Sequence, residues 1–284
     1  TSAIFQIESG FDLGNGKSKQ DGRLFGRKAI IGLTGDSWGT LTLGRQYNVA
    51  DDLVSEIDPF GTSVLQAGVT DGAFGDSVSA RMDNSIKYMS PEFSGFKFGL
   101  AYAGKNYKET DTKEFDRRGH GEREKGEKNT TNWISLGLGF ENGPVSVGAS
   151  YDRYRNDFRS WTETRAHGKT HLDKETVTKG TTHMWNLFGA YDFEVVKLHL
   201  GYGQIRGAVN NAKGVNGVGL NGELAGYTAV DIPVKDSPLG ITQNYTQTNG
   251  FRQQSWMVGL SAPVGDAGTV LFSYQGNKSK NTND

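Results

Sequence analysis

Apolar and polar residues alternate with a period of two in many short segments of the chain. In residues 96–102, for example, the even positions hold Phe, Phe, Leu and Tyr, whereas the odd positions hold Lys, Gly and Ala. A period of two is that of a β-strand, whose successive side chains point to opposite faces. The pattern predicts about eleven strands, near residues 3–12, 27–34, 39–47, 81–89, 96–102, 131–140, 145–153, 182–193, 196–205, 253–263 and 268–276.

The connections between these predicted strands alternate between short and long. The short ones lie at 36–38, 90–95, 141–144, 194–195 and 265–267, and the long ones near 48–80, 103–130, 154–181 and 206–252. Membrane barrels show this alternation because turns are short on one side of the membrane and loops are long on the other. Several long structureless loops are unusual in a soluble domain. The sequence therefore predicts an all-β fold, a transmembrane antiparallel β-barrel in one domain over 1–284. A soluble β-sandwich binding module is the alternative.

The composition fits a barrel and excludes several other classes of protein. The 284 residues include 40 Gly, 6 Pro and no Cys, and no apolar run is long enough for a transmembrane helix. Only every second residue of a barrel strand meets lipid, so a hydrophobic share of 35% is compatible with a membrane protein. The 31 basic and 32 acidic residues nearly cancel, which argues against binding of nucleic acid. The lack of Cys excludes thiol catalysis.

Two stretches of the chain resemble a known family. Residues 3–47, which contain GLTGDSWGTLTLGRQY, and residues 81–102, which contain DNSIKYMSPEFSG, resemble the Gram-negative general porins of the cell outer membrane, betaproteobacterial type. The resemblance implies a barrel of sixteen strands in the full protein, a homotrimer, and contacts with outer-membrane lipid and lipopolysaccharide. It implies an external loop, at about 48–80, that folds into the lumen. It also implies that about two N-terminal and three C-terminal strands lie outside this sequence.

The function implied by the resemblance is a water-filled channel for passive diffusion of small hydrophilic solutes and ions. A substrate-selective channel of the same fold is the alternative, and it would need a ladder of aromatic or single-sign side chains along the lumen. No enzyme is expected, because no serine lies in a recognisable nucleophile context. No cofactor or metal is expected, since no metal-ligand spacing relates the five histidines, His120, His167, His171, His183 and His199.

Basic residues on the barrel wall are the first part of the predicted pore constriction. The resemblance assigns Arg27 and Arg81 to this wall, with Arg45 as a weaker candidate. Alternation supports Arg81, which shares a face with the polar residues Asp83 and Lys87. Alternation does not support Arg27, whose face is apolar. It puts Arg45 with Leu41 and Leu43 on the apolar face of its strand, so a pore role for Arg45 needs a bulge or a position above the lipid.

Acidic residues of the inward loop are the second part of the predicted constriction. The segment 58–61, Asp-Pro-Phe-Gly, is similar to the constriction-loop signature of the family, and Glu56 and Asp58 are the predicted pore acids. We expect Arg27 and Arg81 to lie across a water-filled gap from Glu56 or Asp58. A solvated side chain with no role in the pore is the alternative for each. Four more acids make the loop negative, namely Asp51, Asp52, Asp71 and Asp76.

The densest charge in the sequence lies in residues 105–128. Lys, Glu, Asp and Arg alternate there with few apolar residues. Such a run is typical of a solvated segment, and the sequence predicts an external loop. A lipopolysaccharide-facing surface bridged by divalent cations is the alternative.

Overall fold

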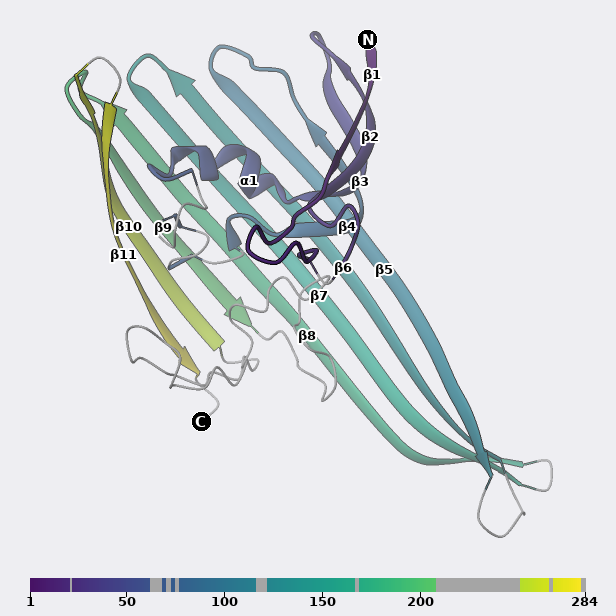
Figure 1. Ribbon diagram of the computed structural model, residues 1–284. Helices are drawn as coiled ribbons and strands as arrows, with labels where there is room; N and C mark the ends of the chain where they lie inside the picture. Colours follow the sequence, from purple (N-terminus) through teal and green to yellow (C-terminus); the bar gives the residue numbers. More distant parts are fainter. Residues whose placement is uncertain are drawn as a thin grey trace.

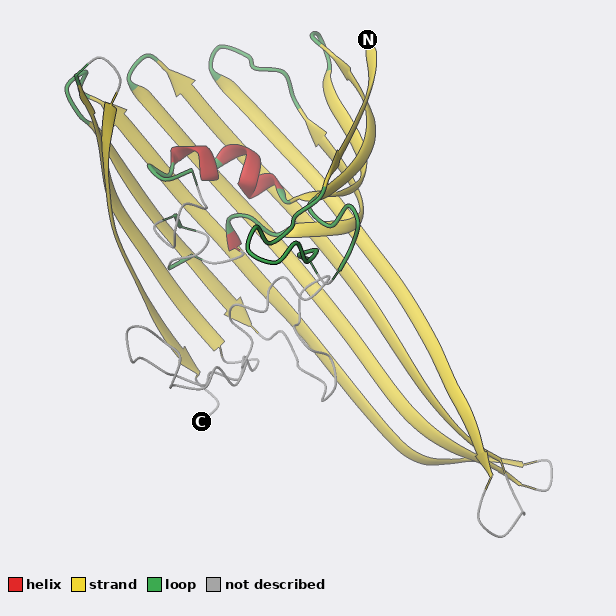
Figure 2. Ribbon diagram, in the orientation of Figure 1, coloured by secondary structure: helices red, strands yellow, loops and turns green. Residues whose placement is uncertain are grey.

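One antiparallel sheet of eleven strands forms the molecule, and each strand pairs with its neighbours in sequence (Figures 1 and 2). The computed structural model describes residues 1–20, 22–61, 68–69, 73–74, 77–115, 122–166, 169–207, 251–265 and 268–281. The strands are β1 (Ser2–Glu8), β2 (Lys28–Gly35), β3 (Gly39–Tyr47), β4 (Arg81–Met89), β5 (Phe96–Phe115), β6 (Glu122–Asn142), β7 (Val145–Ala166), β8 (Lys169–Asp192), β9 (Lys197–Gly207), β10 (Phe251–Val264) and β11 (Gly268–Asn281). All eleven predicted strands are confirmed, and within the described residues β1 and β11 are the edges of the sheet.

Four strands are much longer than the sequence predicted. The prediction of long loops at 103–130 and 154–181 is wrong, because β5 to β8 continue through most of these residues as paired strands. Figure 1 shows the ends of these four strands projecting far beyond the rest of the sheet. Their charged and Thr-rich sequence lacks the apolar alternation that marks a strand against lipid. Cross-strand pairs such as Arg159 with Glu175, 2.5 Å apart, support pairing without an apolar face.

The outer face of the sheet carries the large apolar side chains. We define the inner face as the one that packs against the helical segment after β3, and the outer face as the opposite one. On this face Phe5, Ile7, Phe98, Leu100, Val147 and Leu200 are all exposed, and Leu198 is half-buried beside them. A soluble sandwich would bury this set between two sheets. The arrangement therefore contradicts a sandwich and matches a barrel whose apolar face meets lipid.

Two short helices follow β3 and lie on the inner face of the sheet. They are the α-helix α1 (Val49–Leu53) and the 3-10 helix η1 (Ser55–Ile57), drawn in red in front of the strands in Figure 2. In the part of the chain that the structure describes, no helix is long and apolar enough to cross a membrane.

A bulge interrupts the pairing of β3 with β4. Gly44 pairs with Ser85 and Gln46 pairs with Met82, so one residue of β3 lies opposite two residues of β4. Asn84 has a φ of 51°, in the left-handed region that Asn tolerates better than most residues. The extra residue reverses the alternation, because Met82 is fully buried on the inner face together with Ser85.

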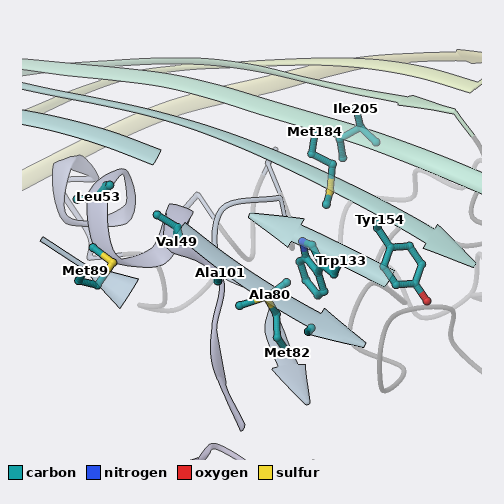
Figure 3. Packing of buried hydrophobic residues seen from close by; sticks show 11 residues of the cluster. Val49, Leu53, Ala80, Met82, Met89, Ala101, Trp133, Tyr154, Met184 and Ile205 are labelled. Atoms are coloured by element: carbon teal, nitrogen blue, oxygen red, sulfur yellow. The ribbon is translucent and has the colours of Figure 1, made fainter. Parts of the chain in front are cut away.

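The apolar core lies between the inner face of the sheet and the segment after β3. Figure 3 shows Val49 and Leu53 of α1 with Met89 on one side of this cluster, and Trp133, Tyr154 and Met184 on the other. A second cluster continues along the same segment, with Val54, Ile57, Val69, Ala73, Phe74 and Val78 against Phe188, Ala190 and Met257. The core therefore fixes this segment to the wall and does not join two sheets.

Candidate functional site

The segment that follows β3 begins and ends at one buried residue pair. The backbone N–H of Asn48 donates to the Ala80 carbonyl (2.8 Å), and the N–H of Ala80 donates to the Asn48 Oδ1 (3.2 Å). The amide nitrogen of Asn48 donates to Asp152 Oδ2 on β7 (3.3 Å), and Asp152 also accepts from the Trp133 indole (2.7 Å). These bonds hold both ends of the segment against the wall.

Glycines on the inner face make room for α1. A Cβ at Gly148 would lie 2.1 Å from the Leu53 carbonyl oxygen, and a Cβ at Gly137 would lie 2.8 Å from a methyl of Val49. The backbone N–H of Val49 donates to Ser135 Oγ (2.9 Å). The small residues that alternate with apolar ones in β5 to β7 therefore make room for a helix against the inner face in this region.

The rest of the segment is bonded to strands further along the sheet. The Ile57 carbonyl lies 2.6 Å from His199 Nδ1 on β9, and Phe74 packs on Phe188 of β8 with ring centroids 4.9 Å apart. Ser255 Oγ of β10 donates to the Ala73 carbonyl (2.6 Å), and the Ala73 N–H donates to Gln275 Oε1 of β11 (3.1 Å). The segment thus crosses the inner face from β3 to β11.

The acids of α1 face lysines of the first four strands. Lys87 Nζ lies 2.6 Å from Asp52 Oδ2 and 3.1 Å from the Tyr47 carbonyl. The Asp51 carboxylate accepts a hydrogen bond from Ser79. Burial raises the pKa of Asp51 to about 6, and the neighbouring Asp52 adds to this, whereas the Ser79 bond and the charges of Lys87 and Lys28 lower it. This cluster combines two acids with two bases at the start of the segment.

Two cavities lie beside the segment on the inner face. The larger, of about 520 Å³, is bounded by β1 to β4, and its lining includes Gln6, Lys28, Thr42, Lys87 and Asp52. The smaller, of about 210 Å³, lies near the short turns and is lined by residues that include Glu56, Lys97 and Lys197. Among the described residues, no group of three or more His, Asp or Glu could hold a metal ion.

The three predicted wall arginines lie together near the loop ends of β2 to β4. Arg27 is 3.7 Å from Glu8, and the Arg81 guanidinium stacks 4.4 Å above the centre of the Tyr47 ring. Arg45 is buried, and it binds Asp83 Oδ1 (2.5 Å) and donates to the Gly26 carbonyl (2.6 Å). The bulge beside Arg45 adds its extra residue to β4 and not to β3, so Arg45 stays on the face of Leu41 and Leu43, while Thr42 and Gln46 lie on the other face. The same bulge makes the predicted shared face of Arg81 and Lys87 wrong, because it reverses the alternation between them.

The two predicted pore acids have different surroundings. Asp58 is only 4% exposed, and its carboxylate accepts hydrogen bonds from the backbone N–H of Val69 (2.9 Å) and of Phe60 (3.4 Å). Glu56 is exposed and lines the smaller cavity. Asp71 and Asp76 lie outside the described residues. Asp58 therefore holds the segment's own backbone, whereas Glu56 is open to solvent.

Lys28 and Lys87 are the charged wall residues that sequence reasoning did not single out. Lys28 is adjacent to the predicted Arg27, and strict alternation from the apolar Ile31 and Leu33 would have placed Lys28 on the inner face. Lys87 was recognised only as a polar neighbour of Arg81. The signal for a bulge in the sequence is Asn84, three residues before Lys87, because Asn adopts a positive φ more readily than most residues.

Comparisons with known proteins agree with this architecture. The family model described as Gram-negative porin matches residues 1–284. An outer membrane porin protein of Bordetella pertussis is 38% identical over 274 residues, which is 96% of this chain and 63% of that protein. The major outer membrane protein P.IA of Neisseria meningitidis is 36% identical over 103 residues, 35% of this chain and 24% of that protein. The chain thus spans less than two thirds of the length of these relatives.

Two solved structures are similar to the chain at low sequence identity. An anion-selective porin from Comamonas acidovorans has 15% identity and a TM-score of 0.37, with 98% of this chain and 74% of that one covered. OmpT of Vibrio cholerae has 13% identity and a TM-score of 0.39, with 99% and 76% covered. On the match of the family model over all 284 residues, the chain belongs to the Gram-negative porin family and is a protein of the outer membrane.

Proposed function

We propose that the protein forms a water-filled channel for passive diffusion of small hydrophilic solutes and ions. One observation supports this most strongly, namely that the apolar side chains lie on the outer face while charged side chains and cavities lie on the inner face. A closed sheet of this kind satisfies its backbone hydrogen bonds in lipid and encloses a polar lumen.

The segment 48–80 is the proposed constriction of this channel. Its described residues cross the inner face between β3 and β11, so in a closed barrel they reduce the open cross-section. Loop closure over some thirty residues costs only a few kcal/mol, and the buried apolar contacts of Val49, Leu53 and Phe74 offset this cost. The homotrimer and the contacts with lipid remain expectations from the family.

The charges proposed to act on a permeating ion are those beside the two cavities. Asp51 and Asp52 face Lys28 and Lys87 at the larger cavity, and Glu56 lines the smaller one with Lys97 and Lys197 nearby. Arg27, Arg81 and Arg45 add positive charge at the loop ends of β2 to β4. Charges of both signs at these cavities, with no single-sign ladder along the lumen among the described residues, favour a general channel over a substrate-selective one.

The test of this proposal is single-channel recording of the full-length protein in a planar lipid bilayer. The expected result is conductance that rises in proportion to salt and falls when neutral polymers small enough to enter the lumen are added. Conductance that saturates with one solute would indicate a substrate-selective channel. A correctly folded protein without conductance would refute the proposal.

A further inference from the structure

Four buried oxygen atoms without a hydrogen-bond partner lie together on the inner face of β6 to β8. They are Oδ1 of Asn129 and Asn156 and Oγ1 of Thr131 and Thr182, which make up four of the six such atoms among the described side chains. Thr131 and Asn156 are each 5% exposed, and Thr182 is 1% exposed. These four residues are called the polar patch below.

The register of the sheet brings the residues of the polar patch side by side. Thr131 lies directly opposite Asn156, and Asn129 is two residues from Thr131 on β6. Thr182 of β8 lies opposite Tyr154, which is two residues from Asn156 on β7. Side chains that are two residues apart, or directly opposite on neighbouring strands, lie on the same face of a sheet. The four oxygen atoms therefore belong to one site.

The polar patch begins where the first apolar cluster ends. Figure 3 shows Trp133, Tyr154 and Met184 at one end of that cluster, and the patch residues of the same three strands lie two positions nearer the long extensions of β6 to β8. Beyond the patch, the buried ring of Phe158 lies opposite Asn129. The patch is therefore flanked by aromatic rings and lies on the side of the constriction that faces the strand extensions.

Glycine occupies the position opposite two members of the polar patch. Gly180 of β8 lies opposite Asn156, and Gly207 of β9 lies opposite Thr182. Glycine within a strand commonly marks a place where a ligand or another part of the chain approaches the backbone closely. Neither glycine has a side chain that could fill the space beside the unpaired oxygen atoms.

The chemistry of the polar patch determines which ligand would satisfy it. A buried oxygen atom that gains no partner costs free energy, because it has lost its hydrogen bonds to water. An amide oxygen needs a donor, whereas a threonine hydroxyl can donate or accept, so the hydroxyl groups of a ligand suit all four positions. No member of the patch is charged, and Lys105, which lies opposite Thr131 on β5, is exposed. These features fit a neutral hydroxylated molecule better than an ion.

We propose that the polar patch binds small neutral solutes with several hydroxyl groups, such as monosaccharides. Asn156 is the central ligand, because it lies between Tyr154 and Phe158 on β7 and opposite both Thr131 and Gly180. The inference rests on the proposed channel and names a class of solute that the channel binds next to its constriction. Binding is weak because only a few hydrogen bonds contribute to it, so the channel remains a general one.

The experiment measures glucose binding by the full-length protein in a detergent without a sugar headgroup, with a ligand-observed NMR titration. Tetraethylene glycol, a neutral solute of similar mass with hydroxyl groups only at its ends, is titrated in parallel. The expected result is saturable binding of glucose and much weaker binding of the glycol. The double variant Thr131→Val/Thr182→Val replaces each hydroxyl by a methyl group of similar shape, and it should weaken glucose binding about tenfold.

Urea unfolding of the same double variant tests whether the two hydroxyls lack partners within the protein. The variant should be at least as stable as the unsubstituted protein, because a methyl group replaces a buried hydroxyl that has no hydrogen bond to lose. A clear loss of stability would show that the hydroxyls are paired inside the protein, and it would overturn the proposal.

The matched control is Thr130→Val, which makes the same chemical change one residue from Thr131 but on the outer face, where the Thr130 hydroxyl donates to Asn106 Oδ1 (3.2 Å). It should bind glucose as the unsubstituted protein does. Equal glucose binding by the Thr131→Val/Thr182→Val variant would overturn the proposal. No glucose binding by the unsubstituted protein would also overturn it, and would mean that water alone fills the patch. Failure of the channel function would instead appear as absent conductance of the unsubstituted protein in a lipid bilayer.

Discussion

Two parts of the inner wall differ in what they meet. The anchored wall, which is the inner face of β5 to β10, carries buried apolar side chains such as Trp133, Phe188 and Met257. The open wall, which is the inner face of β1 to β3 with Lys87 of β4, lines the larger cavity with polar and charged side chains. The strands of both walls alternate inner and outer side chains with the same two-residue period. Inner side chains are therefore apolar where another segment of the chain covers them, and polar or charged where none does.

The difference between the anchored wall and the open wall explains how the segment after β3 can be fixed by apolar contacts and still have charged side chains in contact with water. Val49 and Leu53 project from α1 toward the anchored wall, whereas Asp52 projects toward Lys87 of the open wall. A helix can do this because residues three to four apart share a face and residues between them point elsewhere. The apolar contacts determine the position of the segment, and its charges are those that we propose to act on a permeating ion.

The largest expected effect is that of removing an anchor. Trp133→Ala deletes a fully buried indole that packs edge-on against Tyr154 and donates to Asp152. We expect a loss of about 3–5 kcal/mol in the free energy of unfolding, together with a larger and noisier conductance as the segment loosens. Urea unfolding and single-channel recording measure the two effects.

The matched control for this variant is Leu136→Ala on the outer face of the same strand. Leu136 is exposed on the protein and meets lipid in a membrane, so its loss leaves the conductance unchanged. If Leu136→Ala altered the conductance as much as Trp133→Ala does, the distinction between an anchored inner face and a lipid-facing outer face would be wrong.

A smaller effect is expected from the charges of the open wall. Lys87→Gln leaves the Asp52 carboxylate without the ammonium 2.6 Å away, so the reversal potential should shift toward cations. Asp52→Asn should shift it toward anions. A unit charge at about 4 Å changes the energy of an ion by about 1 kcal/mol in water and about 4 kcal/mol at an effective dielectric of about 20.

Low salt is required for this measurement, because salt screens the charges. Lys128→Gln, an exposed lysine on the outer face of β6, serves as the control with the same change of charge. Shifts of the same sign in Lys87→Gln and Asp52→Asn would contradict the assignment of this pair to the lumen.

The smallest expected effect is a change of selectivity with pH. Asp51 has a pKa of about 6 because it is buried, so it is mostly charged above this pH and mostly neutral below it. Lowering the pH through this value removes a negative charge beside Lys28 and Lys87, and the selectivity should shift toward anions. Asp51→Asn should show a smaller shift over the same range. An identical pH response in the variant would mean that another group titrates.

The sequence predicted the strands well in the part of the barrel where one strand face meets lipid and must be apolar. Segments such as 145–153 alternate clearly because one face must be apolar, and the observed strand covers them. The extensions of β5 to β8 beyond the apolar band were missed, since no apolar solvent imposes alternation there. The charged run in residues 105–128 could only be interpreted as solvated, and pairing between two hydrophilic strands leaves little pattern in either one.

The candidate site was less predictable, because it depends on local geometry and on contacts distant in sequence. The bulge at Asn84 separates Arg81 from the face of Lys87, and a single unpaired residue is enough to do this. The contact of Asp52 with Lys87 joins residues 35 apart in sequence. The Asp58 carboxylate accepts a hydrogen bond from the backbone N–H of Val69, which lies 11 residues later in the sequence. Alternation carries no information on such contacts.

A disulfide between α1 and the anchored wall tests most directly whether the segment lies against the inner face of β6. A Cβ at Gly139 of β6 would lie 4.0 Å from the Leu53 Cβ, which is within the range of about 3.5–4.5 Å that a disulfide requires. These 284 residues contain no Cys, so within them Leu53→Cys/Gly139→Cys forms one defined pair. The control is Leu53→Cys/Gln6→Cys, which places the second cysteine on the open wall, where no disulfide with residue 53 is expected. We predict rapid oxidation of the first pair alone, with a single-channel conductance that does not change on reduction. Failure of the first pair to oxidise in the folded protein, or a conductance that changes when its disulfide is reduced, would contradict this prediction.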